Sequence, residues 1–197
     1  NEKEENGRYI DLSEQKAVEL LTELIQNKQI NEHLALLLKG EQRYGTKVGF
    51  HFGKLIEDKL ALFNDFVKEF KKIDPKESNP SVIAGLLQYI KQMDTILYHQ
   101  IIQSLLRDDF MNLFLFDIIR MQDLDAYDLS VIEQLVETKL VNPNQFRALS
   151  YGSVLDSCSP EHIHRLICSV VEISADFVHP SIDILAMYLM FDEGSIK

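Results

Sequence analysis

Residues 52–70, FGKLIEDKLALFNDFVKEF, carry the apolar spacing that decides the fold class. Large apolar side chains recur there at helical intervals, which places these residues on one face of a helix: Phe52, Leu55, Ile56, Phe63, Phe66, Val67 and Phe70. The same periodicity returns along most of the chain. No stretch alternates with period two for long enough to predict a sheet larger than a short hairpin near residues 44–52. The sequence therefore predicts an all-α protein.

Prolines mark where many of these helices start. Four of the five prolines follow a residue that caps helices or begins turns: Asp74-Pro75, Asn79-Pro80, Asn142-Pro143 and Ser159-Pro160. Start and stop signals together predict helices over 13–27, 31–39, 52–72, 80–92, 95–106, 109–121, 129–139, 143–150, 160–174 and 181–191. Short connections favour antiparallel neighbours, so we expect an irregular α-solenoid of stacked antiparallel helical hairpins, with a closed globular helical bundle as the alternative.

The helical pattern also predicts which side chains form the core. The helix expected over 109–121 is apolar on nearly all sides, which indicates a central position or an aromatic patch offered to a partner. We expect these side chains to be buried: Phe63, Phe66, Phe70, Leu86, Ile90, Leu105, Phe114, Ile118, Leu135, Leu166, Ile184 and Leu185.

Charge divides the 197 residues unevenly. Residues 1–79 carry 13 Lys and Arg against 15 Asp and Glu, whereas residues 80–197 carry 7 against 16. The polar segment IDPKES, residues 73–78, coincides with this change. We therefore expect an N-terminal helical segment over 1–74 and an acidic helical-repeat segment over 75–197, or else one continuous domain. The start at NEKEEN, without a Met, indicates a fragment of a longer protein.

Composition excludes several classes of partner. An acidic surface repels phosphate, so residues 80–197 are not expected to bind nucleic acid or anionic membranes. The longest apolar run, Ile184 to Phe191, is far shorter than the roughly 20 residues of a membrane span. Two cysteines do not make a disulfide framework, which predicts a reducing, cytoplasmic setting.

The glycine-rich segment 39–54, KGEQRYGTKVGFHFGK, is the candidate for cofactor binding, through Arg43, Lys47 and Lys54. Backbone N–H groups flanked by cations can cradle a phosphate. A phosphate-binding loop, however, needs Lys before Ser or Thr and a strand in front, and here Thr46 precedes Lys47 after a helical pattern. We therefore expect a flexible loop between two helices and no cofactor. A small-molecule or nucleotide-binding domain or enzyme that uses the Gly40–Gly53 loop is the alternative.

Two clusters contain residue types that bind metals. Cys158, His162, His164 and Cys168 are suitable zinc ligands, but in a helix that begins at Pro160 only His164 and Cys168 share a face, so we expect no structural metal. The acidic residues Asp123, Asp125 and Asp128 lack the glycine and glutamate that an EF-hand loop requires. We interpret them as an exposed turn between helices and as partner-binding residues.

From Asn142 onward the string NPNQFRALSYGSVLDSCSPEHIHRLICSVV is followed by the apolar helix SIDILAMYLM. Residues 142–191 resemble helical repeats in the C-terminal regions of bacterial STAND/NACHT-type signalling and defence NTPases. The resemblance rests on Phe146, Leu149, Tyr151-Gly152, the helix led by Ser159, and the run from Ile184 to Met187. It implies a sensor or scaffold region whose ATPase lies elsewhere in the parent protein.

No nucleophile elbow, HExxH motif or paired Glu-x-x-His motif occurs in the sequence. We therefore expect a non-catalytic α-helical protein-interaction or regulatory module of a larger protein, acting as a sensor or scaffold. Its expected partner is another protein or another domain of the parent chain, because stacked helices provide extended binding surfaces.

Overall fold

A computed structural model describes residues 2–5, 8–27, 30–152 and 154–192. The secondary-structure elements of these residues are helices apart from one antiparallel hairpin, β1 (Glu2–Glu5) and β2 (Arg8–Asp11), in which Glu2 pairs with Asp11. The all-α class is confirmed. The sequence allowed at most a short hairpin near residues 44–52, and that segment is helical from Gly45 onward. The solenoid and its bundle alternative remain predictions.

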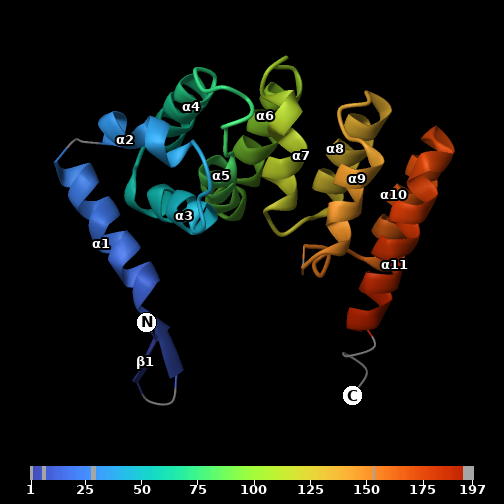
Figure 1. Ribbon diagram of the computed structural model, residues 1–197, viewed down its shortest axis with the longest axis horizontal. Helices are drawn as coiled ribbons and strands as arrows, with labels where there is room; N and C mark the ends of the chain where they lie inside the picture. Colours follow the sequence, from blue (N-terminus) through green and yellow to red (C-terminus); the bar gives the residue numbers. More distant parts are fainter. Residues whose placement is uncertain (1, 6–7, 28–29, 153, 193–197) are drawn as a thin grey trace. The chain divides into compact units, whose positions relative to one another are not determined.

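The chain divides into two compact units, Asn1–Met111 and Asn112–Lys197. After the hairpin, the first unit contains six helices over its described residues (Figure 1): α1 (Leu12–Gln26), α2 (Ile30–Leu37), α3 (Gly45–Leu55), α4 (Lys59–Phe70), α5 (Ser81–Met93) and α6 (Thr95–Leu106). The most extensive packing within this unit joins α3 to α5.

Helices α3 and α5 meet through glycine backbone. Gly45, Gly49 and Gly53 recur at every fourth position of α3, and all three are buried. A Cβ atom on Gly49 would lie 1.9 Å from the Val82 carbonyl oxygen. The two helices therefore approach more closely than any larger side chain would allow. The sequence reading of this segment as a flexible loop is wrong, because its glycines serve helix packing.

Contacts between α3 and α5 join the start of one helix to the start of the other, and the end of one to the end of the other. At the start of α3, Gly45 faces Ser81, and near its end Gly53 faces Tyr89. The two helices consequently run parallel. Helix α4 lies between them in the sequence and carries the chain back toward the start of α3, where α5 begins.

The single helix expected over 52–72 is two helices. Helix α3 ends at Leu55, and the Asp58 carboxylate starts α4 by accepting a hydrogen bond from the Ala61 N–H at 2.9 Å. Phe52 of α3 and Phe66 of α4 are both buried, with their rings edge to face at 5.6 Å. One apolar pattern thus spans both helices because both contribute to the same core.

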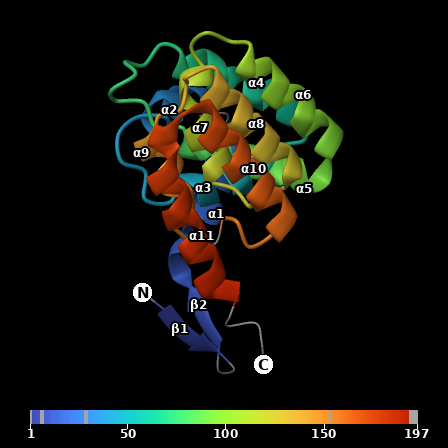
Figure 2. The same ribbon diagram turned by 90° about the vertical axis from the view of Figure 1, so that its right-hand side faces the viewer.

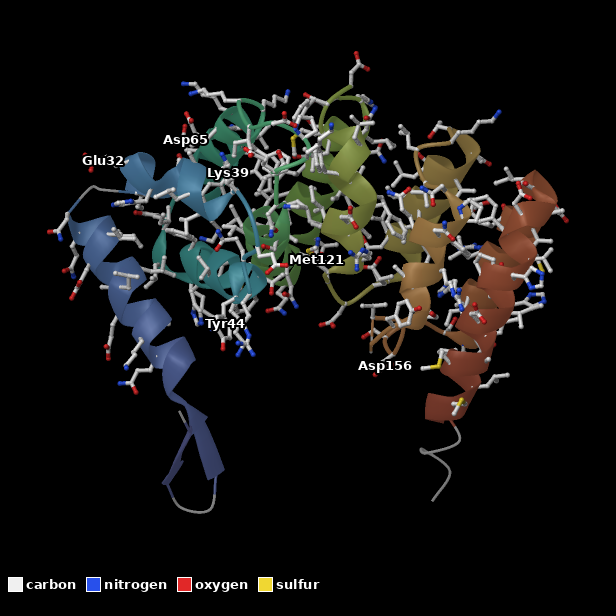
Figure 3. The ribbon with its side chains drawn as sticks, viewed as in Figure 1. Glu32, Lys39, Tyr44, Asp65, Met121 and Asp156 are labelled. Atoms are coloured by element: carbon white, nitrogen blue, oxygen red, sulfur yellow. The ribbon has the colours of Figure 1, made fainter. Side chains whose placement is uncertain are left out.

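Residues 73–79 form a turn that is tied to the end of α2. The Asn79 N–H donates to the Leu38 carbonyl oxygen at 2.9 Å, and the Gly40 N–H donates to the Glu77 carbonyl oxygen at 2.8 Å. Lys39 Nζ, on the residue labelled in Figure 3, lies 2.7 Å from a Glu77 carboxylate oxygen. The compact units divide at 111/112 instead of at the expected 74/75, because packing of α3 on α5 crosses the latter position. Asp74-Pro75 begins this turn and not a helix.

The second unit has five α-helices and two 3₁₀ helices over its described residues: α7 (Asn112–Arg120), α8 (Ala126–Glu137), α9 (Pro143–Phe146), η1 (Arg147–Ser150), α10 (Pro160–Ile173), η2 (Ala175–Phe177) and α11 (Val178–Asp192). Figure 2 shows α8 and α10 side by side. Asn142 and Ser159 cap the helices that begin at Pro143 and Pro160, as predicted.

Burial follows the predicted core closely. Ten of the twelve side chains expected inside are buried, whereas Phe114 and Leu185 are half-buried. In α7 and the residue before it, Met111, Leu115 and Ile118 are buried, but Leu113 is 51% exposed. Across the described ranges, no helix has the length and apolar character required to cross a bilayer.

Candidate functional site

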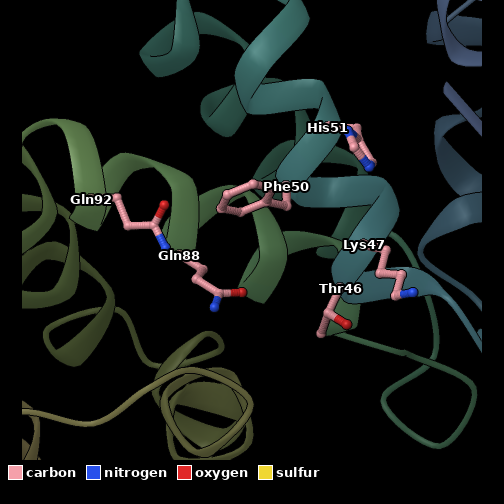
Figure 4. A pocket seen from close by; sticks show the side chains of 6 residues that line it. All are labelled: Thr46, Lys47, Phe50, His51, Gln88 and Gln92. Carbon is pink, nitrogen blue, oxygen red and sulfur yellow. The ribbon is translucent and has the colours of Figure 1, made fainter. Parts of the chain in front are cut away.

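The glycine contact between α3 and α5 leaves a shallow depression beside it, of about 210 Å³. It is lined by Thr46, Lys47, Phe50, His51, Gln88 and Gln92 (Figure 4). Thr46 and Phe50 are one turn apart on α3, and Gln88 and Gln92 are one turn apart on α5. Both pairs lie beside the closely packed glycines, so the parallel packing brings them together.

Aromatic contacts fix one wall of the depression. The Phe50 ring meets the Tyr89 ring edge to face at 5.4 Å, and Lys54 Nζ lies 4.8 Å from the centroid of the Phe50 ring. His51 is only 8% exposed. The lining therefore combines a fixed ring with an ammonium, a hydroxyl, an imidazole and two amides, which suits a small polar or anionic molecule.

The cofactor candidates do not form a phosphate-binding loop. Lys47 lines the depression, whereas Lys54 lies over Phe50, and the Arg43 guanidinium lies 6.0 Å from the centroid of the Tyr44 ring. The backbone nest considered as the alternative does not fit this segment, because the helix already uses the backbone N–H groups from Val48 onward. The sequence reading missed the other lining residues. The spacing of Thr46 and Phe50 becomes visible only once 45–55 is recognised as a helix, and Gln88 and Gln92 join them through the packing of α5 on α3.

The acidic turn differs from its predicted form. Asp125 caps α8 by accepting from the N–H groups of Tyr127 at 2.9 Å and Asp128 at 3.1 Å, and the Asp125 N–H donates to the Asp128 carboxylate at 3.1 Å. Asp128 is fully buried and Asp125 is half-buried, so only Asp123 of the three is exposed. The expectation of three exposed carboxylates is wrong, because two of them form a capping box.

The four candidate zinc ligands separate into three environments. Cys158 is buried, and its Sγ donates to the Leu124 carbonyl oxygen at 3.3 Å. His162 Nδ1 lies 3.1 Å from Ser159 Oγ. His164 and Cys168 are exposed on α10, with His164 Nε2 3.6 Å from Cys168 Sγ. Among the described side chains, no group of three or more His, Cys, Asp or Glu is placed to hold a metal ion.

Two carboxyl groups outside the depression have shifted pKa values. Burial raises the pKa of Asp108, but hydrogen bonds from Lys71, Met111 and Phe110 outweigh it and leave that pKa below the ordinary value. Hydrogen bonds from its own backbone N–H and from the Ser159 side chain lower the pKa of the exposed Glu161. Both shifts follow from hydrogen bonds at helix starts or turns.

Helix α11 carries an apolar face that the fold leaves exposed. Ile182 is 55% exposed, Leu189 57% and Met190 71%, and Ala186 between them is also exposed. At 100° per residue these four side chains lie within an arc of about 100°. We call these residues, Ile182, Ala186, Leu189 and Met190, the α11 stripe.

The opposite side of α11 is firmly packed in the second unit. Ser181 and Ile184 are buried, and the Tyr188 hydroxyl donates to the Cys158 carbonyl oxygen at 3.2 Å. Arg147 Nε of η1 lies 2.7 Å from the Asp183 carboxylate. The α11 stripe is therefore held outward by contacts on its other faces.

Comparison with known proteins found no matching protein family, no matching curated protein and no matching solved structure.

Proposed function

We infer that this chain is a non-catalytic α-helical protein-interaction module, and that it binds a basic amphipathic helix of another protein through the α11 stripe. The observation that carries the proposal is the exposure of that stripe. Helices on protein surfaces normally turn a polar face to water, and contiguous exposed apolar side chains mark interaction sites. The sensor or scaffold role implied by the resemblance to STAND/NACHT-type proteins is compatible with this proposal and remains an expectation.

The geometry of the α11 stripe suits a helical partner. An arc of about 100° matches the apolar face that a helix buries against a neighbouring helix. The large side chains of the stripe stand at positions i, i+7 and i+8, the spacing that a partner helix contacts when it lies along a groove or face. Leu and Met supply adaptable apolar surface for such a contact.

Charge favours a basic rim on the partner. Residues 112–197 carry 5 Lys and Arg against 13 Asp and Glu. Between Val178 and Phe191 the only acidic or basic residue apart from His179 is Asp183, so Asp, Glu, Lys and Arg side chains do not interrupt the stripe. A partner with Lys or Arg beside its apolar face would complement this surface.

Photo-crosslinking tests the proposal on the intact chain. A photoreactive phenylalanine analogue replaces Met190, and in a matched control it replaces Leu113, which is also apolar and 51% exposed in the same unit. We expect a crosslinked protein from the source cell that depends on position 190 and disappears when Leu189→Glu is added. Equal capture from both positions would contradict the proposal.

The oligomeric state separates the proposed partner from a second copy of this chain. Sedimentation of the wild-type protein and of the Leu189→Glu/Met190→Glu variant gives this comparison directly. We expect both to be monomeric. A wild-type dimer that the double substitution dissociates would show that the stripe binds another copy, and the proposal of a basic helical partner would then be wrong.

A second candidate function rests on the depression between α3 and α5. Its ammonium, hydroxyl and amide groups suit a small anion, which keeps the alternative of a small-molecule or nucleotide-binding domain. Thermal unfolding in the presence of ATP, ADP or inorganic phosphate tests whether the depression binds such an anion. A ligand that binds only the folded state raises the free energy of unfolding by RT ln(1 + [L]/Kd). A saturable shift that Lys47→Ala abolishes would favour this function over the first.

A further inference from the structure

Helix α10 presents a histidine and a cysteine side by side on its exposed surface. His164 and Cys168 are four residues apart, so their side chains share a face one turn apart. His164 Nε2 lies 3.6 Å from Cys168 Sγ, and both residues are exposed. Neither side chain belongs to the core of the second unit.

This separation equals the span between two ligands of one tetrahedral metal ion. Zinc binds a thiolate sulfur at about 2.3 Å and an imidazole nitrogen at about 2.0–2.1 Å, and the tetrahedral angle then places the two ligand atoms about 3.6 Å apart. Cys168 Sγ also lies 4.0 Å from His164 Nδ1, so the sulfur lies beside the ring. Rotation of the exposed imidazole about its Cβ–Cγ bond directs the Nε2 lone pair at a shared ion, while α10 fixes the spacing of the two residues.

We propose that His164 Nε2 and Cys168 Sγ form an exchangeable two-ligand site for a borderline-soft divalent ion such as Zn²⁺. Water molecules complete the tetrahedron, and exposure gives them access. Binding replaces the thiol proton with the metal and releases that proton to solvent, while the imidazole binds in its neutral form. Glu172 is one further turn along the same exposed face, where its charge favours a cation.

This site differs from the four-residue zinc cluster considered from sequence. Cys158 and His162 are held by Leu124 and Ser159, and they do not join His164 and Cys168. The fold does not depend on the ion, because the pair lies outside the core. That no metal is bound structurally stays a prediction.

Cobalt titration tests the site, because Co²⁺ adopts the tetrahedral geometry of zinc and a thiolate ligand gives it a charge-transfer band in the near ultraviolet. The probe is Co²⁺ added to the untagged 197-residue chain with its thiols kept reduced, followed by displacement with Zn²⁺. We expect one ion per chain with that band. His164→Ala and Cys168→Ser should each weaken binding at least about tenfold, and His162→Ala on the same helix should not.

Each other result overturns the proposal. Absence of the band, or a band that survives Cys168→Ser, would show that Cys168 is not a ligand. Unchanged affinity in His164→Ala would reduce the site to a single thiol. Equal losses in His162→Ala and His164→Ala would show that the metal does not discriminate between the two histidines. Unfolding temperatures of all variants in the absence of metal should equal that of the wild type, which excludes misfolding as a cause.

Discussion

At the scale of single residues, Gly49 shows how much of the first unit depends on the absence of a side chain. Alanine is ordinarily favoured over glycine within a helix by roughly 0.5–1 kcal/mol. At Gly49, a methyl group would lie 1.9 Å from the Val82 carbonyl oxygen and 2.8 Å from the Leu86 nitrogen, both backbone atoms. Backbone atoms cannot move aside as a flexible side chain can. At position 49 the cost of this steric clash therefore outweighs the gain in helix propensity from alanine.

We therefore predict that Gly49→Ala destabilises the protein by about 1–3 kcal/mol, the usual cost of overpacking. Equilibrium unfolding in urea measures the change, with Ala61→Gly on the exposed surface of α4 as the control. The control should lose only about 1 kcal/mol from helix propensity. A Gly49→Ala protein as stable as the wild type would contradict the close packing of α3 on α5.

Asp108 carries the clearest pH dependence. Its carboxylate hydrogen-bonds Lys71 and accepts from the N–H groups of Phe110 at 3.1 Å and Met111 at 3.0 Å. The pKa of Asp108 is thereby lowered from 3.8 in the folded protein, so its charge stabilises the fold above that value. This contribution is lost as pH falls from 3.8 through the lower folded-state pKa.

We predict that Asp108→Ala costs about 1 kcal/mol at neutral pH, through loss of two hydrogen bonds to the turn before α7 and of a charge pair. Asp108→Asn should cost less, because the amide still accepts the two backbone hydrogen bonds. The difference in unfolding free energy between Asp108→Asn and the wild type should shrink as the pH is lowered through this range. A difference that stays constant with pH would refute the assigned role of the charge.

At the scale of secondary-structure elements, apolar spacing and helix caps predicted most of the second unit. Asn142 and Ser159 precede prolines, and both cap helices because their side chains accept from backbone N–H groups inside the first turn. The break between α3 and α4 was missed, since Phe52 and Phe66 point into one core and preserve the period across it. A periodic apolar pattern indicates that residues face the same core, but it does not show that they belong to one continuous helix.

Helix α3 and the α11 stripe show what the sequence alone does not reveal. The four-residue spacing of Gly45, Gly49 and Gly53 can be interpreted as a helix-packing face only when α5 is known to pack there. Leu189 has the same apolar chemistry as the buried Ile184, and only packing distinguishes the exposed from the buried face of α11. The depression and the stripe both depend on such tertiary contacts.

The start of α8 supplies a prediction at this scale. Asp125→Ala should cost about 0.5–2 kcal/mol, because it removes the cap of α8. Asp123→Ala, in the same turn but on an exposed side chain, should change stability by less than about 0.5 kcal/mol. Thermal or urea unfolding compares the two directly. Equal effects would mean that the capping box contributes nothing to α8.

At the scale of the whole molecule, the acidic surface should govern how fast a partner associates. Residues 80–197 carry 7 Lys and Arg against 16 Asp and Glu, so a basic partner is attracted at long range. Exposed charges are screened beyond about 10 Å at 0.1 M salt. We predict that the association rate with the partner captured at position 190 falls as salt rises, while the dissociation rate changes little. Stopped-flow mixing at several salt concentrations measures both, and an association rate indifferent to salt would make the acidic surface merely solubilising.

The α11 stripe carries the central claim, that this chain is an interaction module. The most direct measurement is the Kd of the captured partner for the wild-type chain, for Leu189→Glu/Met190→Glu, and for Leu113→Glu as the matched control. Central apolar side chains of an interface contribute about 2 kcal/mol or more, so the double substitution should raise Kd on the order of thirtyfold or more. Leu113→Glu should leave Kd unchanged. Equal Kd values for the wild type and the double variant, with both folded, would contradict the account.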